Sequence, residues 1–176
     1  LRGALALLAV IALAGAGVYA FDAYLVPGVG AGAGAVVTSP TGDSQQLTQQ
    51  ADAAMTAGDW SRAIGLYTQA IEADPGYGPA YYGKWAALLQ NNELVQALDV
   101  AIAATKQFAD SRQAWFVLGY TQEARGDLES ALFSYTRSLA LPETAAIDGA
   151  DITEQTVRQR LDLVSYVLAI TEPRVA

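Results

Sequence analysis

Residues 112–145 read RQAWFVLGYTQEARGDLESALFSYTRSLALPETA, and this stretch decides the fold. Apolar residues fall at helical spacing on both sides of the pair Gly126-Asp127. Glycine tolerates the left-handed backbone at the end of a helix, and an aspartate after it accepts hydrogen bonds from the free N–H groups of the next helix. The stretch therefore predicts a helix, a tight turn and a second helix.

The same arrangement recurs with a period of 34 residues between residues 44 and 145. Several independent columns agree on one period, which is a strong indication of a repeat array. A single helical hairpin cannot bury its apolar face, so neighbouring hairpins must stack into a short solenoid. The aligned columns are Ala63, Ala97 and Ala131; Tyr67, Ala101 and Tyr135; Ala70, Ala104 and Ser138; and Gly58, Asn92 and Gly126.

The residue after each predicted turn is acidic. Asp59 and Asp127 are suited to cap the helix that follows, whereas Glu93 is a poorer cap. The alanine column places a small side chain where the two helices of a hairpin must cross closely. The sequence thus predicts an all-α domain of three hairpins.

This pattern resembles the tetratricopeptide repeat, whose motif has an aromatic residue, Leu-Gly and an aromatic residue in the first helix, and Ala, an aromatic residue, Ala and Pro in the second. The predicted repeats are 44–77, 78–111 and 112–145. The second repeat departs from the motif, because Trp85 replaces the small residue and Ala101 the aromatic one. We expect this exchange of large for small to be compensatory. The third repeat carries the motif in Trp115, Leu118, Gly119, Gly126, Ala131 and Tyr135.

Residues 146–176 follow the array as a predicted capping helix and tail. Apolar residues recur at helical spacing between Asp151 and Ile170, which is typical of an amphipathic helix that covers the last hairpin. An additional role for this helix, in docking onto a membrane surface or a partner, is the alternative.

The resemblance implies that the first helix of each repeat lines a concave groove for a partner. This predicted groove is rich in aromatic and amide side chains and has no basic residue. Relatives that grip a C-terminal carboxylate use lysine, arginine and asparagine there, so we exclude carboxylate capture and expect a peptide with apolar anchors. The predicted partner-binding residues are Asp52, Met55, Tyr82, Leu89, Gln90, Gln113, Phe116, Tyr120 and Glu123.

The aromatic members of this set have a second interpretation, as core between repeats. If Tyr82 and Phe116 instead face a partner, replacing both with alanine is expected to weaken partner recovery without unfolding the domain.

Residues 1–26 predict a single transmembrane helix. Gly3 to Phe21 carry no charge, and the apolar stretch reaches Pro27, which is long enough for a hydrocarbon core of about 30 Å. Arg2 places the N-terminal end in the cytoplasm and the repeats outside, by the positive-inside rule. A cleavable signal peptide is the rival interpretation. Small residues suited to packing against another membrane helix are Ala12, Gly15, Ala16 and Ala20.

Residues 27–43 predict a linker rich in glycine, alanine and proline, which serves as a solvated tether or as a strap on a partner. The net charge of −8 argues against binding to nucleic acid. The chain has no cysteine and no histidine, which removes thiolate and imidazole chemistry. The sequence therefore predicts a protein that is not an enzyme and has no cofactor and no metal site.

Two functions fit these features. The first is a scaffold, an accessory subunit of a larger membrane protein complex in the bacterial cytoplasmic membrane, which contacts other membrane protein subunits and the lipid bilayer. The alternative is a free-standing extracytoplasmic assembly factor or adaptor that transiently binds client peptides in its groove. Stoichiometric recovery with a complex distinguishes the first from the second.

Overall fold

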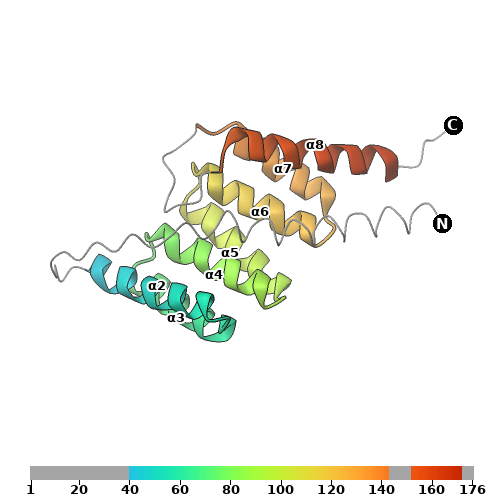
Figure 1. The fold of residues 1–176 in the computed structure, drawn as a ribbon. Helices are drawn as coiled ribbons and strands as arrows, with labels where there is room; N and C mark the ends of the chain where they lie inside the picture. Colours follow the sequence, from blue (N-terminus) through green and yellow to red (C-terminus); the bar gives the residue numbers. More distant parts are fainter. Residues whose placement is uncertain (1–39, 143–151, 172–176) are drawn as a thin grey trace.

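The computed structural model describes residues 40–142 and 152–171, which form seven α-helices and, within these ranges, no strand (Figure 1). Consecutive helices pack against one another along the whole series, and α2 also contacts α4. The result is three stacked helical hairpins with a final helix at one end. The helices are α2 (Pro40–Thr56), α3 (Trp60–Ala73), α4 (Gly78–Gln90), α5 (Leu94–Gln107), α6 (Arg112–Ala124), α7 (Leu128–Leu139) and α8 (Glu154–Thr171).

The helix boundaries follow the sequence period closely. α4 begins at Gly78 and α6 at Arg112, the first residues of the second and third predicted units. α2 begins at Pro40, four residues inside the predicted linker 27–43. Proline is well tolerated in the first turn of a helix, because the N–H that it lacks has no partner within the helix there.

The predicted membrane helix, 1–26, lies outside the described residues, as do its packing residues Ala12, Gly15, Ala16 and Ala20 and most of the linker. Among the helices that the structure describes, none combines the length and the apolar character needed to cross a membrane.

The turn inside each hairpin has the predicted left-handed residue. The φ angles of Gly58, Asn92 and Gly126 are 75°, 61° and 81°. The side chains of Asp59 and Asp127 cap α3 and α7, accepting from backbone N–H groups three residues later at 3.2 Å. Glu93 makes no such bond to α5, so the prediction that it is the poorer cap is confirmed.

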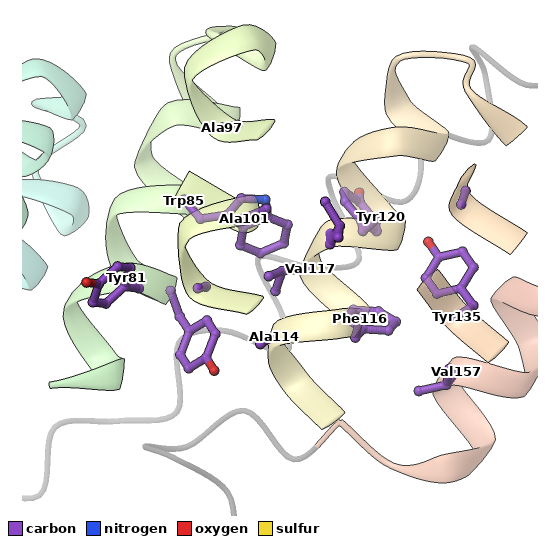
Figure 2. Packing of buried hydrophobic residues seen from close by; sticks show 14 of the residues in the cluster. Tyr81, Trp85, Ala97, Ala101, Ala114, Phe116, Val117, Tyr120, Tyr135 and Val157 are labelled. Carbon is purple, nitrogen blue, oxygen red and sulfur yellow. The ribbon is translucent and has the colours of Figure 1, made fainter. Parts of the chain in front are cut away.

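The core lies between the two helices of each hairpin and between neighbouring hairpins (Figure 2). The alanine column is fully buried at Ala63, Ala97 and Ala131, which allows the close crossings that the sequence predicts. Trp85 and Ala101 lie in the same buried cluster, with Trp85 only 1% exposed. The large side chain on α4 thus occupies the crossing at which α5 contributes only a methyl group.

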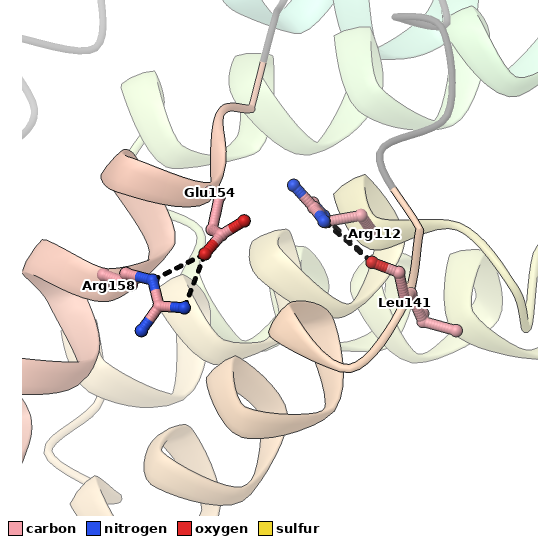
Figure 3. A network of polar contacts seen from close by, with 4 residues as sticks. All are labelled: Arg112, Leu141, Glu154 and Arg158. Carbon is pink, nitrogen blue, oxygen red and sulfur yellow. Dashed lines mark hydrogen bonds and ion pairs between the residues drawn. The ribbon is translucent and has the colours of Figure 1, made fainter.

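α8 packs against α7 through Val157 and Val164, which are buried in the main core cluster. Two arginines act near this end of the stack (Figure 3). Arg112 donates from Nε and Nη2 to the carbonyl of Leu141, at 3.3 and 2.8 Å, and so ties α6 to the segment that follows α7. Arg158 pairs with Glu154 within α8, and this exposed pair contributes little to stability.

Candidate partner-binding surface

The first helix of each hairpin, α2, α4 and α6, contributes one face to a common surface, which we call the first-helix face. Its predicted residues divide into two groups in the structure. Asp52 is exposed, and Met55, Leu89 and Gln90 are half-buried, so part of each of these side chains on α2 and α4 is within reach of a partner. Met55 and Leu89 also pack against the buried clusters. The buried group consists of Tyr82, Gln113, Phe116, Tyr120 and Glu123.

The aromatic residues of the buried group join the inter-repeat core. The Tyr82 hydroxyl lies 3.2 Å from Ser111 Oγ. Phe116, 1% exposed, stacks at a tilt on Tyr120 and on Tyr135, with ring centroids 6.3 and 5.7 Å apart. Burial raises the pKa of Tyr82 and Tyr120 above the ordinary tyrosine value. This arrangement matches the second interpretation that the sequence left open for these aromatic residues.

The expected effect of the double alanine substitution at Tyr82 and Phe116 changes accordingly. Removing two buried aromatic side chains costs about 3–5 kcal/mol for each fully truncated ring. Unfolding, rather than a selective loss of partner binding, is therefore the expected result, and binding tests require the accessible residues instead.

On the α2 side of the face, Asp52 is held by a tyrosine from α3. Tyr67 donates its hydroxyl to Asp52 Oδ1 at 2.5 Å, and its ring lies in the core. Burial, followed by the bond to Asp52, raises the pKa of Tyr67 far above its ordinary value, so the phenol stays neutral. The bond fixes the carboxylate at the surface, where it gives the face a negative charge.

On the α6 side, a second acid is enclosed by α7 and α8. Tyr135 donates to Glu123 Oε2 at 2.7 Å, and Arg160 from α8 donates to Glu123 Oε1 at 3.1 Å. The Arg160 guanidinium also lies over the ring of Tyr120, 4.8 Å from its centroid, in a cation–π contact. These contacts close the α6 end of the face and leave its α2 and α4 part open.

Arg160 is a residue of this surface that sequence reasoning missed. The available signal was a cation near the apolar side of a predicted capping helix, between Val157 and Val164. A largely buried arginine is stabilised by an acidic partner. For Arg160 this partner is Glu123 on α6, which is distant in the sequence. Helical spacing identifies the side of the helix but not this partner.

The accessible part of the face can bind but offers little chemistry. Among the described residues, no group of three or more acidic side chains could hold a metal ion. In the part of the chain that the structure describes, the positively charged residue at this face is Arg160, and it is already paired with Glu123. The arrangement suits a segment with apolar anchors and, beside Asp52, a donor or positive charge.

Comparison with known proteins gives the same architecture. The family model described as tetratricopeptide repeat matches residues 54–116. The heat-shock protein cognate (HSC) co-chaperone sgt12 of Aspergillus fumigatus is 26% identical over 125 residues, which are 70% of this chain and 36% of the relative. The chain therefore spans about a third of that relative's length.

Two solved structures share the fold. The Sgt2 TPR domain from Aspergillus fumigatus has a TM-score of 0.64 and 23% identity, covering 81% of this chain and 93% of that domain. The first TPR domain of Spaghetti (RPAP3), bound to the HSP90 peptide SRMEEVD, has a TM-score of 0.61 and 20% identity, covering 73% and 95%. The family match over residues 54–116, the 34-residue period and the stacked hairpins together show that the hairpins of this chain are tetratricopeptide repeats.

Proposed function

We propose that this protein is a non-catalytic adaptor that binds a segment of a partner protein on the open, α2–α4 part of the first-helix face. The observation that carries the proposal is the accessible set Asp52, Met55, Leu89 and Gln90, which combines apolar side chains with one fixed carboxylate. Tetratricopeptide repeat proteins are generally interaction modules, and a similar domain holds a peptide.

The ligand we propose differs from the acidic peptide of that similar domain. A segment ending in EEVD brings several negative charges. Among the described residues, the face presents the carboxylate of Asp52, and its arginine, Arg160, is already paired with Glu123. Like charges brought together in an interface oppose binding. We therefore propose an internal partner segment with apolar anchors, recognised transiently, as for a client-binding adaptor.

The test compares partner recovery for two matched variants of the full chain, with mass spectrometry after purification in mild detergent. Leu89→Asp places a charge on the first-helix face, whereas Val95→Asp places one on α5, where Val95 is 61% exposed. We expect the amount of partner recovered with Leu89→Asp to fall at least ten-fold and the amount recovered with Val95→Asp to stay unchanged. Both variants should unfold cooperatively. Equal recovery with both variants would refute the proposal.

A synthetic SRMEEVD peptide tests the ligand class directly. We expect no saturable binding to the full chain by fluorescence anisotropy. Saturable binding that Asp52→Asn strengthens would show that the face accepts acidic C-termini after all.

We also propose that residues 1–26 anchor this adaptor in a membrane, with the repeats on the extracytoplasmic side. The uncharged run from Gly3 to Phe21 supports this. Carbonate-resistant membrane association that is lost on deletion of 1–26 is the expected result. A stoichiometric complex with other membrane subunits would favour the scaffold role over transient client binding.

A further inference from the structure

The last helix carries a second apolar stripe that capping does not explain. Val157 and Val164 on one side of α8 are buried against the last hairpin. On another side, Tyr166 and Ile170 are 64% and 55% exposed, and Leu163 beside them is half-buried. These three residues lie at helical spacing along one stripe. A helix that only ends a solenoid needs one apolar side and a polar outer face.

The stripe continues the first-helix face. Val157, Arg160 and Val164 have the same spacing on α8 as the buried residues Ala114, Val117 and Thr121 on α6. In that register, Leu163 and Tyr166 correspond to Tyr120 and Glu123, which are first-helix-face residues of α6. The contacts of Arg160 with Tyr120 and Glu123 fix the rotation of α8 about its axis in this register.

Arg160 therefore separates an inner from an outer part of α8. Going around the helix from the buried valines, Arg160 comes first, then Val167 and Leu163, and then the exposed pair Tyr166 and Ile170. The opposite flank carries Arg158, whose side chain is 63% exposed and paired with Glu154, and is polar. The exposed apolar residues thus lie beyond Leu163 on the Arg160 side of α8 and are turned away from the buried valines.

The size and charge of the stripe indicate what covers it. Three side chains offer far less than the roughly 800 Å² per partner of a stable dimer, so the stripe alone cannot hold a second copy of this chain. Asp162 is exposed one helical turn before Tyr166, and the whole chain has a net charge of −8. The two arginines of α8, Arg158 and Arg160, already pair with Glu154 and Glu123, so the charge beside the stripe is that of Asp162. This charge disfavours an anionic lipid surface and favours a basic segment.

We propose that Leu163, Tyr166 and Ile170 form a docking stripe for an amphipathic partner helix that has apolar residues on one side and lysine or arginine on its flank. The inference rests on the proposed function, because the stripe prolongs the first-helix face beyond α6 and adds a second contact for the same partner. α8 is then both the cap of the solenoid and part of its binding surface.

Two synthetic 14-residue peptides test the stripe against the full chain by fluorescence anisotropy. Both have leucines at i, i+3, i+4 and i+7; one has lysine and the other glutamate at the remaining positions. We expect the lysine peptide to bind at least ten-fold more tightly. The double variant Tyr166→Ser/Ile170→Ser should weaken that binding at least ten-fold.

The matched control is Val95→Ser/Phe133→Ser, which removes two apolar residues that are 61% and 65% exposed on α5 and α7. This variant should bind the lysine peptide like the parent chain, and circular dichroism should show both double variants folded. Equal loss in the two double variants, or equal affinity for the two peptides, would overturn the proposal. So would Tyr166-dependent binding to phosphatidylglycerol vesicles, which would assign the stripe to a membrane surface.

Partner recovery separates this inference from the proposed function. If Tyr166→Ser/Ile170→Ser keeps the partner that Leu89→Asp loses, the docking stripe is refuted and the adaptor function stands. If Leu89→Asp keeps the partner as well, both are refuted. Loss in both variants supports both.

Discussion

In the third hairpin the ring of Tyr135 lies directly over Gly119, whereas in the second hairpin the equivalent positions hold Ala101 and Trp85. A Cβ added at Gly119 would lie 2.8 Å from the Tyr135 ring. The second hairpin reverses this arrangement, with the large side chain on the first helix and the small one on the second. The large side chain comes from the second helix in the third hairpin and from the first helix in the second hairpin. The repeat therefore constrains the summed volume of the two facing side chains more than the identity of either one.

The exchange in the second hairpin also adds a link between hairpins. Trp85 donates from Nε1 to Thr121 Oγ1 on α6 at 2.7 Å, and Thr121 donates onward to the carbonyl of Val117. The rings of Trp85 and Tyr120 form a T-shaped contact, with centroids 5.7 Å apart. Trp85 therefore links the second hairpin to the third. The hydrogen bond of Tyr135 and its ring contact with Phe116 lie within its own hairpin.

The largest expected effect comes from undoing the exchange in the second hairpin. Trp85→Gly removes a fully buried indole and should cost about 4 kcal/mol or more of unfolding free energy. Ala101→Tyr alone overfills the crossing and should cost about 1–3 kcal/mol. Urea unfolding of each variant measures these values.

The double variant Trp85→Gly/Ala101→Tyr restores the arrangement of the third hairpin and sharpens the comparison. Because the two residues share one space, we expect it to be more stable than the sum of the single effects by about 1–3 kcal/mol. Additive effects would mean that the two side chains do not share a volume. Incomplete recovery is expected, since Thr121 loses its indole donor.

The sequence predicted the hairpins and their turns because these depend on local signals. Gly58, Asn92 and Gly126 are the residue types that a left-handed turn requires, and each turn lies where the period places it. The binding surface was less predictable, since a residue such as Phe116 has the same motif position whether it faces a partner or the core. Phe116 is packed against Tyr135 of α7, and its neighbour Tyr120 lies under Arg160 of α8, which is distant in the sequence.

A smaller effect is expected from adding one methyl group at the crossing of the third hairpin. Gly119→Ala forces its Cβ against the Tyr135 ring and should cost about 1–2 kcal/mol, even after the gain in helix propensity. Gly65→Ala on α3 is the matched control, because nothing lies within 4 Å of its added Cβ. It should stabilise the chain by up to about 1 kcal/mol. Thermal unfolding that ranks the two variants in the opposite order would contradict the packing at Gly119.

Tyr67 and Tyr135 occupy the column position that Ala101 fills in the second hairpin, and both make the stability of the chain sensitive to alkali. Burial raises the pKa of Tyr67 and Tyr135, so each contributes stability that is fully present below the unfolded tyrosine pKa near 10. Above that pH only the unfolded chain ionises, and stability falls by about 1.4 kcal/mol per pH unit for each tyrosine. Unfolding free energy measured from pH 9 to 11 should fall less steeply for Tyr67→Phe/Tyr135→Phe than for the parent chain.

The titration of Lys84 does not affect the difference between the pH curves of the parent chain and the double variant. Burial lowers its pKa, so it also titrates in the alkaline range, but it is present in both chains and its contribution cancels. Parallel pH curves for the two chains would contradict the raised pKa of both tyrosines.

The smallest expected effect concerns the start of the second helix in each hairpin. Asp127 caps α7 through Ser130 N–H, whereas Glu93 bonds to the side chain of Asn91 and leaves α5 without a side-chain cap. Glu93→Asp should supply the missing acceptor to the N–H of Gln96 and gain about 0.5 kcal/mol, since the bond to Asn91 is lost. Asp127→Glu should lose a similar amount, so urea midpoints that shift in opposite directions support the comparison. A shared direction would mean that the length of the side chain that carries the carboxylate does not decide the cap.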